Sequence, residues 1–127
     1  MTSQERITIH GDIDIVNARM AVREFARHLG LGLTDQSCIS MACSSLAYSL
    51  GLGRENNPGG EMLIEPFSSQ QHQGVRVRCI KNQANAADQE IINHLGNSRW
   101  LVDDIEMKPA PGNGIEVIVT KWASRGS

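Results

Sequence analysis

The chain has 127 residues, of which 40% are hydrophobic and 20% are charged, and its formal net charge is −2. This length and composition fit one globular domain over residues 1–127 and exclude a disordered chain. The slightly acidic balance argues against nucleic-acid binding, which usually needs a basic surface, and gives no electrostatic reason to bind an anionic membrane.

Patterns of apolar residues predict a strand followed by two helices in the first half of the chain. Residues 6–10 alternate apolar and polar side chains, which is typical of a short half-buried strand. Apolar residues then recur at three- and four-residue steps over residues 15–29 and 39–50, which predicts two amphipathic helices. Gly30 stands where the first helix needs a left-handed residue to end, and Gly51 ends the second.

The second half of the chain shows two pairs of strands separated by one helix. Residues 61–67 and 74–81 are strand-like and are joined by a short polar segment, which predicts an antiparallel hairpin. Residues 84–95 fit a helix, and residues 104–108 and 115–122 fit the last two strands. An Asn-Gly pair between these last strands favours a tight hairpin turn.

The predicted element order is therefore β-α-α-β-β-α-β-β. Strands that follow one another mostly as hairpins, with few helices between them, favour a mixed, mostly antiparallel sheet with the helices on one face. The fold class is α/β (α+β), a two-layer sandwich.

The sequence also bears on the cellular compartment. No run of residues approaches the length of a membrane span, and the polar N-terminal segment lacks the apolar core of a signal peptide. The three cysteines include no Cys-x-x-Cys pair, and neither they nor the four histidines have metal-ligand spacing. We therefore expect a cytoplasmic protein with small buried thiols and no metal site.

A family resemblance covers nearly the whole chain, in order, with one short region missing. Its segments are residues 15–19, 25–32, 35–36, 74–78, 82–83, 100–106 and 112–122. In these segments the chain resembles the small anti-sigma regulatory Ser/Thr kinases of bacterial partner-switching and stressosome systems. Those kinases belong to the GHKL superfamily, whose histidine-kinase-like ATPase fold is a helical layer on a mixed sheet. The resemblance implies that fold and a site for Mg-ATP.

The first nucleotide signature of the family is a glutamate and an asparagine, four residues apart on the second helix. The glutamate acts as or positions the base for phosphoryl transfer, and the asparagine holds magnesium. Here the matching residues are Ser45 and Ser49. A serine hydroxyl is no base near neutral pH unless it is activated, and it is a poor magnesium ligand. We expect no catalytic residue and no metal ligand at these degenerate positions, and interpret both as small polar residues on a partly buried face.

The other two signatures are an adenine-reading Asp-x-Gly-x-Gly turn and a glycine-rich lid over the phosphates. The turn is represented by Asn82, Ala84 and Ala86, and the alanines resist the positive φ that glycine allows. The shortened lid keeps only Gly96. All three signatures fail by separate changes, so no cofactor is expected, and ATP and Mg would bind only if the site works after all.

The leading hypothesis is a catalytically degenerate relative of these kinases, a pseudokinase that acts as a protein-binding regulatory module. The resemblance implies a STAS-domain regulator as the partner, with a homodimer as an alternative. Candidate partner-binding residues lie between the second helix and the former lid. Leu50 and Leu52 would offer apolar area if exposed, Arg54 and Glu55 offer charge, and Trp100 could fill the emptied nucleotide pocket.

Two other functions stay open. An active Ser/Thr protein kinase would need a relocated nucleotide site, with Asn82, Asp88 or Glu90 taking over the missing roles. A small-molecule sensor would need a ligand-sized cavity at the former nucleotide site. Arg76 and Arg78 alternate along one strand, which fits either a solvated sheet face or a face that docks an acidic partner.

Overall fold

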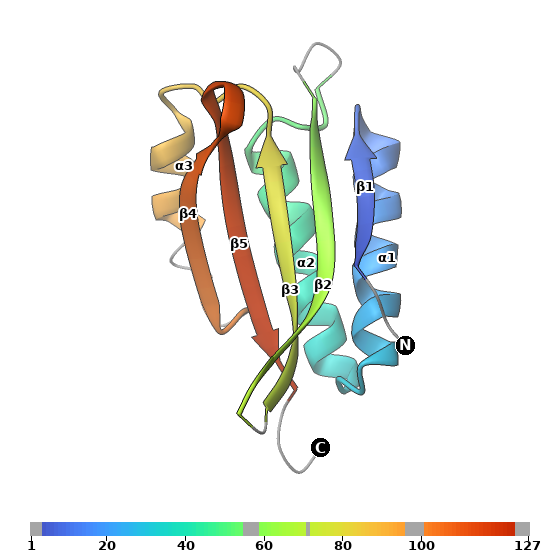
Figure 1. The fold of residues 1–127 in the computed structure, drawn as a ribbon. Helices are drawn as coiled ribbons and strands as arrows, with labels where there is room; N and C mark the ends of the chain where they lie inside the picture. The colour runs from blue at the N-terminus through green and yellow to red at the C-terminus, as the bar shows by residue number, and fades with distance from the viewer. Residues whose placement is uncertain (1–3, 55–58, 71, 96–100, 124–127) are drawn as a thin grey trace.

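The structure, a computed structural model, describes residues 4–54, 59–70, 72–95 and 101–123. Its elements follow the predicted order (Figure 1). They are β1 (Glu5–Ile9), α1 (Asp12–His28), α2 (Leu33–Ser49), β2 (Gly60–Ser69), β3 (His72–Lys81), α3 (Asp88–Leu95), β4 (Asp104–Ala110) and β5 (Gly114–Trp122). None of the described helices is long and apolar enough to cross a membrane.

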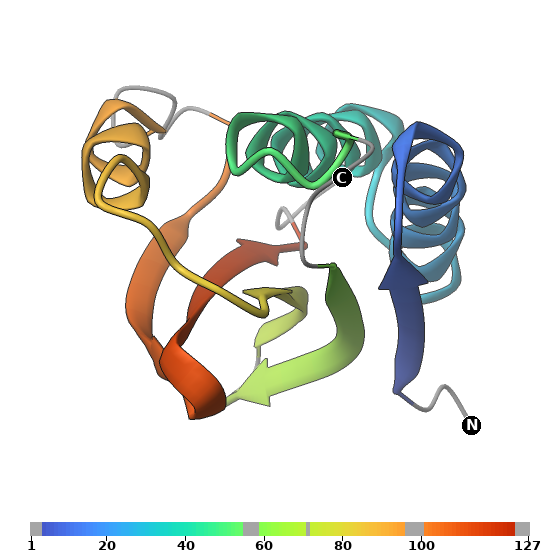
Figure 2. The same cartoon turned by 90° about the horizontal axis from the view of Figure 1, so that it is seen from above.

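The five strands form one sheet in the order β1-β2-β3-β5-β4, and every described pairing is antiparallel. The predicted hairpins β2–β3 and β4–β5 are both present. All three helices lie on one face of the sheet (Figure 2). The predicted two-layer sandwich is confirmed, with a sheet that is antiparallel rather than mixed.

The core lies between the sheet and the α1–α2 pair. Alternate residues of β3 face the helices, and Val75, Val77 and Cys79 are fully buried there. They meet Ile15 of α1 and Ile39 of α2 within one apolar cluster. Each such aliphatic side chain stabilises the fold by about 1.5–3 kcal/mol through burial, so this cluster fixes α2 on the sheet.

The sequence predicts buried thiols for all three cysteines, and two of them belong to this core, whereas Cys38 is only partly buried. Cys43 on α2 and Cys79 on β3 are both buried and form no disulfide. Burial raises the pKa of the Cys79 thiol to about 12. Burial, with a smaller contribution from Cys79, raises the pKa of Cys43 well above its usual value. Both thiols therefore stay protonated and unreactive near neutral pH.

The opposite face of the sheet carries a network of charged side chains. Arg78 donates from Nε to Glu65 Oε1 at 3.1 Å, and its Nη1 lies 3.5 Å from Glu116 Oε1. Arg76 places its guanidinium 3.6 Å from the ring centroid of Phe67. Both arginines have partners within the sheet, which favours the solvated-face interpretation over a face reserved for an acidic partner.

The turn between β4 and β5 differs in detail from its prediction. The left-handed residues are Gly112 (φ 73°) and Asn113 (φ 66°), so the turn lies one residue before the Asn-Gly pair. Gly114 is extended, and it is needed because a Cβ there would lie 2.6 Å from the carbonyl oxygen of Lys81. The close approach brings this turn against the end of β3.

Candidate functional site

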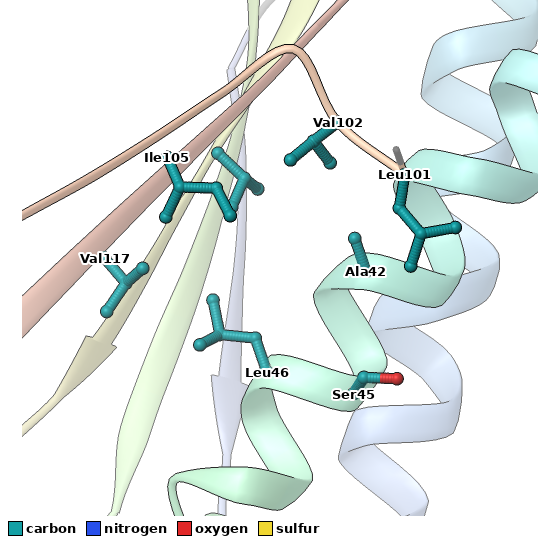
Figure 3. Close-up of a pocket in the computed structure, with 8 residues that line it drawn as sticks. Ala42, Ser45, Leu46, Leu101, Val102, Ile105 and Val117 are labelled. Atoms are coloured by element: carbon teal, nitrogen blue, oxygen red, sulfur yellow. The ribbon is translucent and has the colours of Figure 1, made fainter. Parts of the chain in front are cut away.

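The degenerate catalytic positions lie on the outer part of α2. Ser45 and Ser49 are one helical turn apart, and both side chains are exposed rather than partly buried as predicted. In the close-up of the adjoining pocket, the Ser45 hydroxyl points away from the strands (Figure 3). Neither position offers a carboxylate or an amide, so this part of α2 has no group suited to base catalysis or to magnesium.

A small apolar hollow lies beside Ser45, between α2 and strands β4 and β5 (Figure 3). Its volume is about 50 Å³. The lining residues are Ala42, Ser45, Leu46, Leu101, Val102, Ile105, Val117 and Val119. Ligand pockets usually measure roughly 300–1,000 Å³ and carry a few well-placed polar groups. This hollow is too small for a nucleotide, and its lining contains no charged side chain that could hold a phosphate.

The turn after β3 matches the family's adenine-reading turn in sequence position. Asn82, Ala84 and Ala86 are all exposed. Neither alanine has a positive φ, so the turn has a backbone that does not need the family's glycines. The Asn82 backbone N–H donates to the Gly59 carbonyl at 3.1 Å, which ties the turn to the chain just before β2.

The carboxylates proposed for a relocated active site are in different environments. Asp88 is 1% exposed, and both its oxygens bind the Lys81 ammonium, at 2.9 and 3.1 Å. It therefore cannot contact a substrate without breaking a buried ion pair. Glu90 is exposed on α3. Sequence analysis missed the Lys81–Asp88 pair, because no local pattern shows that a lysine at a strand end meets an aspartate across a turn.

For two of the candidate partner-binding residues, the predicted exposure is wrong. Leu50 is 2% exposed and Leu52 is fully buried, so neither offers apolar surface. Gly51 adopts φ 82° and reverses the chain, and the Leu52 N–H then donates to the Ala47 carbonyl at 3.0 Å. This helix-ending motif folds the following leucine back onto the helix.

The other three candidate partner-binding residues are either exposed or outside the described part of the chain. Arg54 is exposed at the end of the reversed segment. Glu55, Gly96 and Trp100 lie outside the described residues. The proposal that the Trp100 indole fills the nucleotide pocket therefore stays a prediction.

α2 also carries an uncharged exposed stripe that was not predicted from the sequence. Met41 and Tyr48 are 49% and 47% exposed, and with Ser45 they follow helical spacing along one side of α2. The helix has one charged residue, Asp35, which is buried and lies 3.7 Å from the Lys121 ammonium. A surface helix normally carries charge on its outer side, and exposed Met and Tyr without charge are typical of protein interfaces.

Other parts of the described chain add little to this site. No group of three or more His, Cys, Asp or Glu side chains among the described residues could hold a metal ion. A broad open hollow of about 490 Å³ lies at the β2–β3 turn, beside His72, Asp103 and Trp122. Trp122 packs against Phe67 with ring centroids 5.1 Å apart, but it is only partly buried and lies outside the apolar core cluster.

Comparisons with known proteins show what this chain is similar to. No family model matches the chain. The chain is 26% identical to the serine/threonine-protein kinase RsbT of Bacillus subtilis (strain 168), over 96% of its own length and 98% of that protein.

A solved structure shares the fold. The crystal structure of the RsbU and RsbW domains of Rv1364c from Mycobacterium tuberculosis matches 94% of the chain, with a TM-score of 0.67 and 18% identity. The chain spans 32% of that longer protein. Together the comparisons support the resemblance found in the sequence: the chain is similar to RsbT over nearly its whole length and shares the fold of the RsbU–RsbW structure.

Proposed function

We propose that the protein is a catalytically degenerate member of this group that acts by binding another protein, without nucleotide. The observation that supports the proposal is the apolar hollow of about 50 Å³ beside Ser45, the position that the resemblance assigns to the family's catalytic glutamate. Phosphoryl transfer depends on groups that neutralise the phosphates, hold the metal and orient the nucleophile. Serines at positions 45 and 49 and an aliphatic lining supply none of these.

The binding part of the proposal rests on the exposed stripe Met41–Ser45–Tyr48. A charged partner group placed over this stripe would lose its hydration without gaining a counter-charge, which is unfavourable. An uncharged surface of a partner would instead bury the Met and Tyr side chains. The family resemblance makes a STAS-domain regulator the first partner to test, and a second copy of the chain is the alternative.

The competing function is an active ATP-dependent Ser/Thr kinase that phosphorylates a STAS-domain partner. The specific observation in its favour is that RsbT, with 26% identity, is named a serine/threonine-protein kinase. Against it, Asp88 is held in a buried ion pair, which leaves Asn82 and Glu90 as the exposed candidates. A sensor function at the former nucleotide site is disfavoured by the small volume of the hollow.

The experiment measures binding of purified STAS-domain regulators from the same cells, with and without Mg-ATP. We expect binding that is the same in both conditions, with no phosphorylated partner by mass spectrometry. Tyr48→Ala should weaken binding at least about tenfold, as truncation of an interface aromatic commonly does. The matched control is Ile13→Ala, which truncates a side chain that is 76% exposed on α1. Phosphorylation of the partner, or equal binding by Tyr48→Ala, would contradict the proposal.

A further inference from the structure

A buried lysine at the end of β3 has no role in the function proposed above. The residues of β3 that face the helices are Val75, Val77, Cys79 and then Lys81, which is only 4% exposed. Lysine is almost never fully buried unless it is paired. Its position at the end of an otherwise apolar row therefore points to a specific partner.

That partner is Asp88, the first residue of α3, which is 1% exposed. The Lys81 ammonium donates to Asp88 Oδ1 at 2.9 Å and to Oδ2 at 3.1 Å. The same carboxylate accepts the Asn85 backbone N–H at 2.8 Å. One buried carboxylate thus joins the end of a strand, the following turn and the start of a helix.

Further hydrogen bonds complete the turn around this ion pair. The Asp88 N–H donates to the Asn85 carbonyl at 3.2 Å, and the Ala87 N–H donates to the Asn85 side-chain oxygen at 2.9 Å. The Ala84 N–H donates to the Asn113 carbonyl at 2.9 Å. All six residues from 82 to 87 are exposed, so burial of side chains within the turn does not hold it on the core.

From this arrangement we infer that the Lys81–Asp88 pair is a built-in latch, which fixes the 82–87 turn and the start of α3 on the sheet without any ligand. This latch bears on how the protein works without nucleotide, and in that respect it rests on the proposed function. The turn is the counterpart of the family's adenine-reading turn, and a turn that the chain's own ion pair holds in place needs no nucleotide to be ordered.

The latch predicts a local response when one partner is removed. Asp88→Asn keeps the shape of the side chain but leaves the Lys81 ammonium buried without a counter-charge. Lys81→Met leaves the Asp88 carboxylate buried without one. A buried charge without its partner is strongly unfavourable. The turn and the helix start should therefore leave the sheet, while the strands behind them stay paired.

The experiment is amide hydrogen exchange by NMR, in buffer without nucleotide, so its outcome does not depend on whether Mg-ATP binds. The reporters are the bonded amides of Ala84, Asn85, Asp88 and Ile91. In each single variant their protection should fall by about 100-fold or more, while amides of the β3–β5 ladder keep wild-type protection. The double variant Lys81→Met/Asp88→Asn should lose no more than the larger single loss, because the two residues act as one unit.

The matched control is Lys108→Met, which removes an exposed lysine 3.7 Å from Glu116 on the same sheet; Glu116 keeps its contact with Arg78, so all four reporters should stay unchanged. The latch is overturned if the single variants keep the reporters protected, if protection falls equally across the sheet, or if the two losses multiply in the double variant. If the variants do not fold, hydrogen exchange of the Lys81 ammonium in the wild-type protein tests the latch instead. A Lys81 ammonium whose protons are protected from exchange supports the latch, and one that exchanges freely overturns it.

Discussion

Replacing Leu52 with alanine tests whether this side chain is part of the core or part of a docking surface. Leu52 is fully buried, and its Cδ2 lies 3.0 Å from the point where a Cβ on Gly60 would stand, at the start of β2. Truncating a buried leucine removes apolar burial and leaves a cavity, which costs about 2–5 kcal/mol. We expect Leu52→Ala to lose about 3 kcal/mol of unfolding free energy and to melt roughly 10–15 °C lower.

The assay is urea unfolding followed by circular dichroism, with the melting temperature measured in parallel. Leu33→Ala is the control, because Leu33 is 73% exposed at the start of α2 and its truncation should change stability by less than about 0.5 kcal/mol. At a temperature where it is fully folded, Leu52→Ala should bind the partner as the wild type does. Wild-type stability together with weakened partner binding would refute the burial argument and restore Leu52 as a surface residue.

Three further predictions follow from the core, the β4–β5 turn and the degenerate site. Because burial raises the pKa of the Cys43 and Cys79 thiols, both deprotonate more easily in the unfolded chain than in the folded protein. Their contribution to the free energy of unfolding is therefore fully present below about pH 9 and is lost as the pH rises toward 12. The free energy of unfolding measured against pH should show this fall, with a smaller slope in Cys79→Ala. Gly114→Ala should destabilise by about 1–3 kcal/mol because its Cβ would meet the Lys81 carbonyl, whereas Gly11→Ala, with no heavy atom within 4 Å, should not lose stability by such a clash; comparable losses would contradict the close approach. Ser45→Glu alone should not phosphorylate a STAS-domain partner, because a metal ligand and the phosphate-binding lid are still missing; a phosphorylated product on mass spectrometry would show an intact site.

The element order was predictable from the sequence because each element has a strong local pattern. The stripe of α1 and the alternation of β3 follow helical and strand periods, and burial of one face explains both. The burial of Leu52 could also have been predicted from the sequence. Gly30-Leu31 and Gly51-Leu52 both follow a helix, and both leucines are buried by the same helix-ending hydrogen bonds. A glycine followed by a leucine at such a position is a local signal for a buried leucine.

The candidate site was only partly predictable, because its properties depend on contacts between distant segments. Ser45 and Ser49 show in the sequence that a base and a metal ligand are missing. The size of the hollow does not follow from α2 alone, since Leu101, Val102 and Val117 close it from elsewhere in the chain. The Lys81–Asp88 pair is likewise set by how the turn folds. The neutral outer side of α2 was visible as a lack of charge, and its meaning became clear once Met41 and Tyr48 were seen to be exposed.

Calorimetric titration of the purified protein with Mg-ATP tests the central claim most directly. The account predicts no binding heat at concentrations up to the millimolar range, and no rise in melting temperature with saturating nucleotide, because a ligand that does not bind the native state cannot stabilise it. The double variant Ser45→Glu/Ser49→Asn, titrated in parallel, should give no binding heat either, since the hollow stays small and the rest of its lining stays aliphatic. Binding of Mg-ATP by the wild-type protein with a Kd in the micromolar range would contradict the account.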